Sequence, residues 1–100
     1  MEAPETSLMI AICDQGVEPD VMPVLEAFGI KHYTKISDVS GVGETGRREG
    51  NAVWPGQNTV LLMAMPSEKV DPLIERLHAV RDSYPLTPGM RFIVVPARLV

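Results

Sequence analysis

The residue types that could carry chemistry are concentrated in one glycine-rich stretch, residues 40–58, which holds five glycines. Gly41, Gly43 and Gly46 satisfy the pattern G-x-G-x-x-G, which in dinucleotide-binding proteins brings backbone amides against a pyrophosphate. That fingerprint also requires a helix to begin at the glycines, but residues 47–58 contain two more glycines and a proline and cannot supply one. The stretch is therefore not a dinucleotide-binding motif.

The same stretch retains a weaker potential as an anion site. Glycine-flanked amides after a strand can form a nest that binds an anion, and Arg47 and Arg48 would complement a phosphate or a carboxylate-rich partner. A solvated turn without any ligand is the alternative, since glycine-rich loops of that kind are common. Trp54, the only tryptophan, indicates either a protein interface or a loop that packs back onto its own sheet.

A second loop, residues 84–91, offers the other candidate ligand contact. Gly89 gives access to the backbone, and Arg91 provides a positive charge just before an apolar run. The alternative is a tight turn followed by an arginine whose stem lies along apolar surface.

The remaining chemically competent side chains are scattered along the chain. Cys13, His32 and His78 could join Asp38 or Glu44 in a metal site, but none has the short spacing of known ligand pairs. Surface or structural histidines are the alternative. No serine, histidine and acid fall in a nucleophile arrangement. We therefore expect no metal site and a protein that is not an enzyme.

Composition places the chain among ordinary globular domains. Its 100 residues, 45% of them hydrophobic and 22% charged, match one domain spanning residues 1–100. A formal net charge of −4 removes the usual attraction to a phosphate backbone, so we expect no nucleic-acid partner. The apolar runs are too short to cross a bilayer and Cys13 lies within one of them, which favours a cytoplasmic protein with a buried, reduced thiol.

Hydrophobic periodicity predicts four strands and two helices. In chain order we expect a strand at 8–13, a helix at 17–28, strands at 30–39 and 58–65, a helix at 70–80 and a strand at 92–95. The continuous apolar run at 8–13 indicates a strand that is buried on both faces.

Capping and breaking residues refine these bounds. Gly29 should close the first helix in a left-handed conformation. Pro23 lies inside that helix, which is therefore either kinked or starts later than the periodicity indicates. Asp71 should be the N-cap of the second helix, with Pro72 at its first position. Pro96 should end the last strand.

The element order β-α-β-β-α-β, with right-handed crossovers, leaves one compact arrangement. This is an α+β ferredoxin-like fold with a long loop between the second and third strands. Both helices then cover one face of the sheet. The other face would stay open in a single chain whose strands are this apolar, so we expect an oligomer that covers it.

Three segments carry a resemblance to a known family: V-S-G-V-G at residues 39–43, F-G-I at 28–30 and I-V-V-P at 93–96. Together with the element order, they resemble the PII signalling proteins and their PII-like relatives, as a divergent branch. The resemblance implies a homotrimer of ferredoxin-like subunits with a nucleotide in the cleft between subunits. It also implies a long T-loop, here about residues 40–58, that contacts a partner protein such as a transporter or an enzyme.

The resemblance assigns roles to individual residues. Gly41 and Gly43 match the glycines at the base of the T-loop, and Arg91 falls where the family has a phosphate-binding lysine. The expected ligand-binding residues are Gly41, Gly43, Glu44, Thr45, Gly89 and Arg91. The expected partner-binding residues are Arg47, Arg48 and Trp54.

The sequence also departs from the family pattern. Gly89 stands alone where members have a glycine pair, and no basic residues follow Val100, where members contact a phosphate bound to the neighbouring subunit. We therefore do not expect ATP to bind in the usual way. Residues 47–50 lack the tyrosine that is modified in nitrogen-sensing members, so a role tied to uridylylation is not expected.

Three functions follow from these features. The first is a PII-like regulator that binds a small anionic ligand, an adenine nucleotide or bicarbonate, and signals to a partner through residues 40–58. The second is a metal-responsive trimer similar to the CutA proteins, which share the subunit architecture, with His32 as its best ligand. The third is a ligand-free interaction module that docks Trp54 into a partner.

Overall fold

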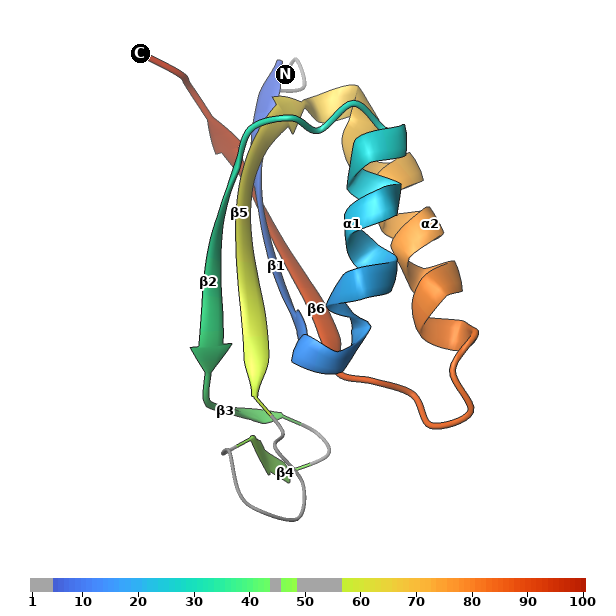
Figure 1. Ribbon diagram of the computed structural model, residues 1–100. Coiled ribbons are helices and arrows are strands. Elements are labelled where there is room, and N and C mark those ends of the chain that lie inside the picture. The colour runs from blue at the N-terminus through green and yellow to red at the C-terminus, as the bar shows by residue number, and fades with distance from the viewer. Residues whose placement is uncertain (1–4, 44–45, 49–56) are drawn as a thin grey trace.

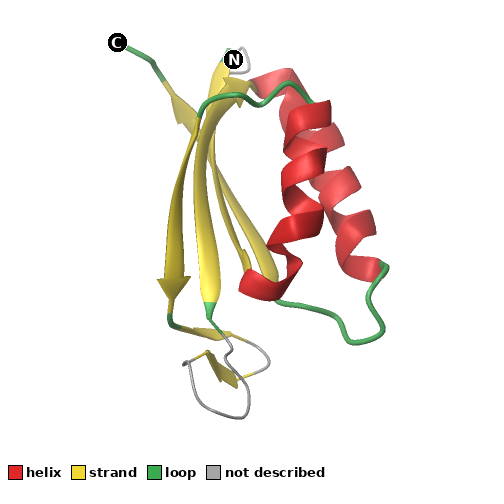
Figure 2. Cartoon of the chain, viewed as in Figure 1, coloured by secondary structure: helices red, strands yellow, loops and turns green. Residues whose placement is uncertain are grey.

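Four antiparallel strands form the framework of the protein. The computed structural model describes residues 5–43, 46–48 and 57–100. Its main sheet has the strand order β2-β5-β1-β6, with β1 at Thr6–Asp14, β2 at Tyr33–Val39, β5 at Asn58–Pro66 and β6 at Met90–Ala97 (Figure 1). Two helices, α1 (Glu18–Ala27) and α2 (Val70–Asp82), lie side by side on one face of this sheet (Figure 2). The predicted α+β ferredoxin-like fold is confirmed.

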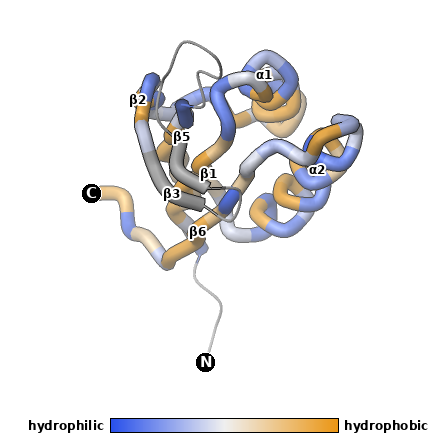
Figure 3. The backbone as a smooth tube through the Cα atoms, turned by 90° about the horizontal axis from the view of Figure 1, so that it is seen from below, coloured by the Kyte–Doolittle hydropathy of each residue, from blue (hydrophilic) through white to orange (hydrophobic). Residues whose placement is uncertain are grey.

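Alternation along β1 and β5 builds the core beneath the helices. Every second residue of both strands is buried, because successive side chains of a strand point to opposite faces of the sheet. Viewed along the strands, the sheet and the helix pair form two layers with the core between them (Figure 3). The buried core residues include Met9, Ala11, Cys13, Leu61, Met63 and Met65 on the sheet, and Val21, Leu25, Leu73 and Leu77 on the helices.

The opposite face of the sheet, which we call the open face, is not covered by any described element. Its apolar members include Leu8, Ile10 and Ile12 on β1, Val60, Leu62 and Ala64 on β5, Ile36 on β2, and Ile93 and Val95 on β6. The members on β1 and β5 are half-buried, whereas Ile36, Ile93 and Val95 are 47%, 43% and 39% exposed. The prediction that β1 is buried on both faces is therefore wrong for a single chain, because both helices pack on the same side.

The first helix begins and ends at signals that are visible in the sequence. A 3₁₀ turn, η1 (Gln15–Val17), leads into α1, and Pro19 lies in the first turn, where its missing N–H costs no helical hydrogen bond. The helix continues through Pro23 and starts only one residue later than predicted. Gly29 closes it as predicted, with a φ of 73° and its N–H donating to the carbonyl of Glu26 at 2.9 Å.

The start of α2 differs from the prediction. A 3₁₀ turn, η2 (Ser67–Lys69), leads directly into the helix, so the cap residue is Lys69 rather than Asp71, and no side chain in the described part of the chain caps the helix. Asp71 lies instead in the first turn, where its charge faces the positive end of the helix dipole. Pro72 is the third residue of the helix, not the first.

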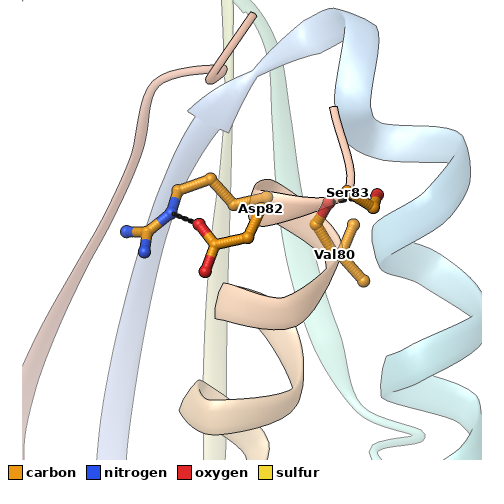
Figure 4. A network of polar contacts seen from close by, with 4 residues as sticks. Val80, Asp82 and Ser83 are labelled. Atoms are coloured by element: carbon orange, nitrogen blue, oxygen red, sulfur yellow. Dashed lines mark hydrogen bonds and ion pairs between the residues drawn. The ribbon is translucent and has the colours of Figure 1, made fainter. Parts of the chain in front are cut away.

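The C-terminal end of α2 is closed by polar contacts of its last turn. Ser83 Oγ donates to the carbonyl of Val80 at 2.6 Å, and Arg81 Nε lies 3.0 Å from Asp82 Oδ1 (Figure 4).

Among the described residues, no helix is both long enough and apolar enough to span a bilayer.

The two edge strands have other bounds than predicted. β2 begins at Tyr33 rather than at Ile30, because Ile30 is buried and its N–H donates to the carbonyl of Leu25 at 2.9 Å, at the end of α1. β6 continues through Pro96, which was predicted to end it. This proline is tolerated because β6 lies at the edge of the sheet, where a missing N–H can face away from the neighbouring strand.

A small hairpin lies within the long connection between β2 and β5. Its strands, β3 (Gly41–Gly43) and β4 (Gly46–Arg48), pair in antiparallel fashion at the end of the sheet where β2 stops (Figure 1). The glycine pattern of the sequence therefore forms a strand pair rather than a helix start, in agreement with the rejection of the dinucleotide motif.

Candidate functional site

Four segments of the chain meet at one end of the sheet: the end of β1, the end of β2 with its hairpin, the start of β5 and the start of β6 (Figure 1). Two backbone hydrogen bonds join the end of β1 to the starts of β6 and β5. Asp14 N donates to Gly89 O at 2.9 Å, and Gln15 N donates to Gln57 O at 2.9 Å. The carboxylate of Asp14 also accepts a hydrogen bond from Gly16 N at 3.0 Å, which closes the turn after β1. This end of the sheet therefore holds both glycine-containing segments that were predicted to bind a ligand.

The hairpin supplies the backbone of the first segment. Gly41 and Gly43 lie on β3, with Gly41 opposite Arg48 and Gly43 opposite Gly46. The backbone of Arg47 and Arg48 lies on β4, which brings these predicted partner contacts beside the predicted ligand contacts. Three further predicted site residues lie outside the described part of the chain: Glu44, Thr45 and Trp54.

Gly89 and Arg91 form the second segment, at the start of β6. Gly89 is half-buried, and its carbonyl already accepts the hydrogen bond from Asp14. Arg91 is exposed and pairs with Ile12 on β1. Since Ile12 belongs to the open face, Arg91 presents its positive charge at the rim of that face.

The two segments adjoin opposite edge strands of the main sheet. β2 and β6 are separated by β5 and β1, so three interstrand spacings place these two strands roughly 14 Å apart. Gly41 and Gly43 lie on β3, in the separate two-stranded sheet that follows β2, whereas Gly89 and Arg91 lie at the start of β6. The structure therefore brings the predicted ligand-binding residues to the same end of the sheet, on segments that adjoin opposite edge strands.

A β-bulge connects β2 to the hairpin and was not predicted. Ile36 pairs with Val60, but the next pair is Val39 with Asn58, so β2 has one residue more than β5 at this point. Asp38 accommodates the extra residue with a φ of 59°, the only positive φ of a non-glycine residue in the described ranges. Aspartate tolerates this conformation better than most residues do, and this is the only signal in the sequence that could have suggested the bulge.

The carboxylate of Glu18 links α1 to β2 and β5 on the helix-covered face of the sheet. Glu18, the first residue of α1, has Oε1 2.8 Å from Lys35 Nζ on β2, and its Oε2 accepts a 3.3 Å hydrogen bond from Thr59 Oγ1 on β5. Contact with Glu18 and its charge raise the pKa of Lys35. The Glu18 side chain is 17% exposed and that of Lys35 is 41% exposed, so the ion pair lies at the edge of the core. The sequence contains no local signal for this cluster.

Cys13 lies beside this cluster, paired with Thr59 across the sheet. Its side chain is buried, and burial, followed by the charges of Glu18 and Asp14, raises its pKa to about 11. The thiol therefore stays protonated near neutral pH and lacks the thiolate character of a nucleophile or a metal ligand. This agrees with the predicted buried thiol.

The loop before β6 is held at both of its ends. The Tyr84 hydroxyl donates a hydrogen bond to the carboxylate of Asp20 on α1, and this bond raises the pKa of Tyr84. At the other end of the loop, the carbonyl of Gly89 is bound by Asp14. Leu86, between these anchors, is 80% exposed.

Cys13, His32 and His78, which were considered for a metal site, do not meet. Cys13 points into the core, His32 is exposed just before β2, and the ring of His78 on α2 lies 5.6 Å from that of Phe92 on β6, at an interplanar angle of 51°. Within the described ranges, no three histidine, cysteine, aspartate or glutamate residues are grouped so that they could hold a metal ion. His78 is a packed side chain, which was the structural alternative.

Comparison with known proteins covers nearly the whole chain. The sequence model of the family described as "Nitrogen regulatory protein P-II" matches residues 6–97. No curated protein matches the chain at a significant level. Among solved structures, CPII from Thiomonas intermedia K12, a nitrogen regulatory PII-like protein bound to ADP, AMP and bicarbonate, is 22% identical with a TM-score of 0.67, over 92% of this chain and 89% of that chain.

A DUF3240 family protein from Shewanella baltica OS155 is 14% identical with a TM-score of 0.73, over 98% of this chain and 96% of that chain. At these identities, the two structures show a shared fold.

Proposed function

The chain belongs to the nitrogen regulatory protein P-II family, and we propose that it is a ligand-sensing regulator rather than an enzyme. It binds a small anionic ligand, an adenine nucleotide or bicarbonate, in the clefts between the subunits of a homotrimer. It passes the signal to a partner protein through residues 40–58. Residues 1–100 act as one domain in this proposal, and the reduced, buried Cys13 favours the cytoplasm as the place of action.

The observation that carries the proposal is that the ligand-binding residues lie on two segments that adjoin opposite edge strands of the main sheet. Gly41 and Gly43 follow β2, whereas Gly89 and Arg91 lie at the start of β6. In the proposed homotrimer, the β2 edge of one subunit meets the β6 edge of the next in a heterologous contact that closes a ring, so the two halves of a site adjoin at every interface. A site that is incomplete in one chain would thus be complete in the ring.

The open face supplies a driving force for such an assembly. Its apolar residues run across all four strands, and those on the edge strands retain much of their exposure in the single chain. Burial of apolar surface is worth roughly 25 cal/mol per Å², and a contiguous exposed apolar face of this kind marks an interaction surface. Association of subunits through the open face would therefore explain why its residues are apolar.

The charge distribution favours a ligand with few anionic groups. Residues 83–90 contain no lysine or arginine, and Arg91 is the first basic residue after this loop. Arg91 is also the only basic residue among those assigned to the ligand, and one guanidinium can bind one carboxylate or phosphate group in a bidentate manner. AMP and bicarbonate match this single charge and ADP exceeds it by less than ATP does, so we propose AMP, ADP or bicarbonate rather than ATP. The likeness to CPII, whose structure holds ADP, AMP and bicarbonate, supports this choice.

The partner contact is assigned to Arg47, Arg48 and Trp54. The hairpin that bears the two arginines lies beyond the end of β2 (Figure 1), where another protein can approach it. The net charge of −4 argues for a protein partner rather than a nucleic acid.

Isothermal titration calorimetry with AMP, ADP and bicarbonate tests the ligand proposal. Arg91→Ala should weaken binding about ten- to a hundredfold, because a hydrogen bond to a charged group contributes roughly 1.5–3 kcal/mol. Arg76→Ala removes the same charge from an exposed position on α2 and should leave the affinity unchanged. If a well-folded oligomer gave no heat with any of the three ligands, the proposal would be contradicted.

A further inference from the structure

The regular pairing of β2 with β5 is interrupted at Asp38, three residues before the hairpin begins. From Tyr33 to Ile36 the strand pairs regularly with β5, and the next pair is Val39 with Asn58. Three steps along β2 therefore correspond to two steps along β5. The extra residue is taken up where Asp38 adopts the left-handed conformation, with a φ of 59°.

This bulge changes the face to which the following residue belongs. Ile36 and Val60 lie on the open face, and strict alternation would return Val39 to the helix side of the sheet. Pairing with Asn58, which is two residues from Val60 and thus on the same face, places Val39 on the open face instead. The chain therefore enters the hairpin from the opposite face to the one that an uninterrupted strand would give.

The strand is held firmly just before the bulge. Lys35 lies 2.8 Å from Glu18, and Glu18 accepts a hydrogen bond from Thr59 on the neighbouring strand. These contacts fix the last regular part of β2 to both α1 and β5. The segment that contains Asp38 joins this anchor to Gly41, so its backbone conformation is one determinant of the direction of the hairpin relative to the sheet.

We propose that Asp38 is a positioning residue whose left-handed backbone conformation orients the hairpin strands β3 and β4 relative to the main sheet. Aspartate can hold this conformation, whereas a β-branched side chain opposes it. The effect on hairpin direction concerns this chain's own backbone. Its consequence for a ligand, namely that Gly41 and Gly43 face the neighbouring subunit's Gly89 and Arg91, rests on the proposed function.

The test compares four substitutions of Asp38 in the full chain. Asp38→Gly and Asp38→Asn accept the left-handed conformation, whereas Asp38→Val opposes it strongly and Asp38→Ala opposes it more mildly. Residual dipolar couplings of the Gly41, Gly43 and Gly46 amides report the direction of the hairpin, and those of β1 and β5 report the sheet. The Gly and Asn variants should keep the wild-type couplings. The Val variant should change the three glycine couplings and leave those of β1 and β5 unchanged. If the Val variant does not fold, the less strained Ala variant provides the same comparison.

AMP affinity is the second readout. The Val variant should bind AMP about tenfold more weakly than wild type, while the Gly and Asn variants should bind as wild type does. Unchanged glycine couplings in the Val and Ala variants, or a loss of thermal stability without any change in these couplings, would overturn the inference. If wild type bound no AMP, the proposed function would fail, but the couplings would still decide whether Asp38 aims the hairpin.

Discussion

Replacing Ile93 with aspartate should separate the proposed homotrimer into monomers. Ile93 lies on the open face, opposite Ile10, and is 43% exposed in the single chain. Full burial of an isoleucine is worth about 1.5–3 kcal/mol, so burial of the exposed fraction contributes roughly 0.6–1.3 kcal/mol per copy. An aspartate would instead place an unpaired carboxylate in an apolar interface, which costs several kcal/mol per ion. Over three copies the loss is on the order of 10 kcal/mol.

Sedimentation velocity and light scattering measure the outcome. Wild type should have a mass of three times the 10.9 kDa chain, and Ile93→Asp a mass close to 10.9 kDa with an unchanged circular dichroism spectrum. Ala79→Asp adds the same charge at an exposed position of α2 and should keep the wild-type mass. An Ile93→Asp variant that stays at the wild-type mass would refute the assignment of the open face as the subunit interface, and so would a wild type that is monomeric at tens of micromolar.

Two stability predictions concern the polar cluster behind the site. The pKa of Cys13 is raised from 9.0 to about 11, so the thiolate forms more readily in the unfolded chain than in the folded one. The folded state therefore has a stabilisation of roughly 2.7 kcal/mol that is complete below pH 9 and is lost as the pH rises through 11. Urea unfolding should show that Cys13→Ala removes this part of the pH dependence, and an identical pH dependence in both proteins would disprove the prediction. Glu18→Ala should lower the free energy of unfolding by roughly 1–3 kcal/mol, because the buried Thr59 hydroxyl loses its acceptor. Glu18→Gln keeps an acceptor and should cost less, so equal losses for the two variants would count against this role.

The fold was predictable because most elements carry a local signal. Apolar runs located β1 and β5, and Gly29 ended α1 in the left-handed conformation that only glycine adopts easily. The predictions that failed concern positions whose structure depends on neighbouring elements. The cap of α2 is Lys69 because the 3₁₀ turn before it is held beside β1, where Ser67 N donates to Glu5 O at 3.0 Å. Pro96 remains within β6 because that strand lies at the edge of the sheet.

The candidate site was predictable only in part. The sequence located Gly41 and Gly89, but their positions next to opposite edge strands depend on the strand order, which no local pattern contains. The contacts of Glu18 with Lys35 and with Thr59 join residues far apart in the chain. The bulge at Asp38 depends on the register between β2 and β5, and register is a property of the paired strands rather than of either one alone.

A crystal structure of the protein grown with AMP tests the central claim most directly. The proposal predicts a ring of three subunits that contact one another through the open face. It predicts AMP in each cleft, with its phosphate between the β3 backbone at Gly43 of one subunit and Arg91 of the next. AMP bound wholly within one subunit, or an intact trimer with empty clefts at saturating AMP, would contradict the claim that the ligand site is completed between subunits.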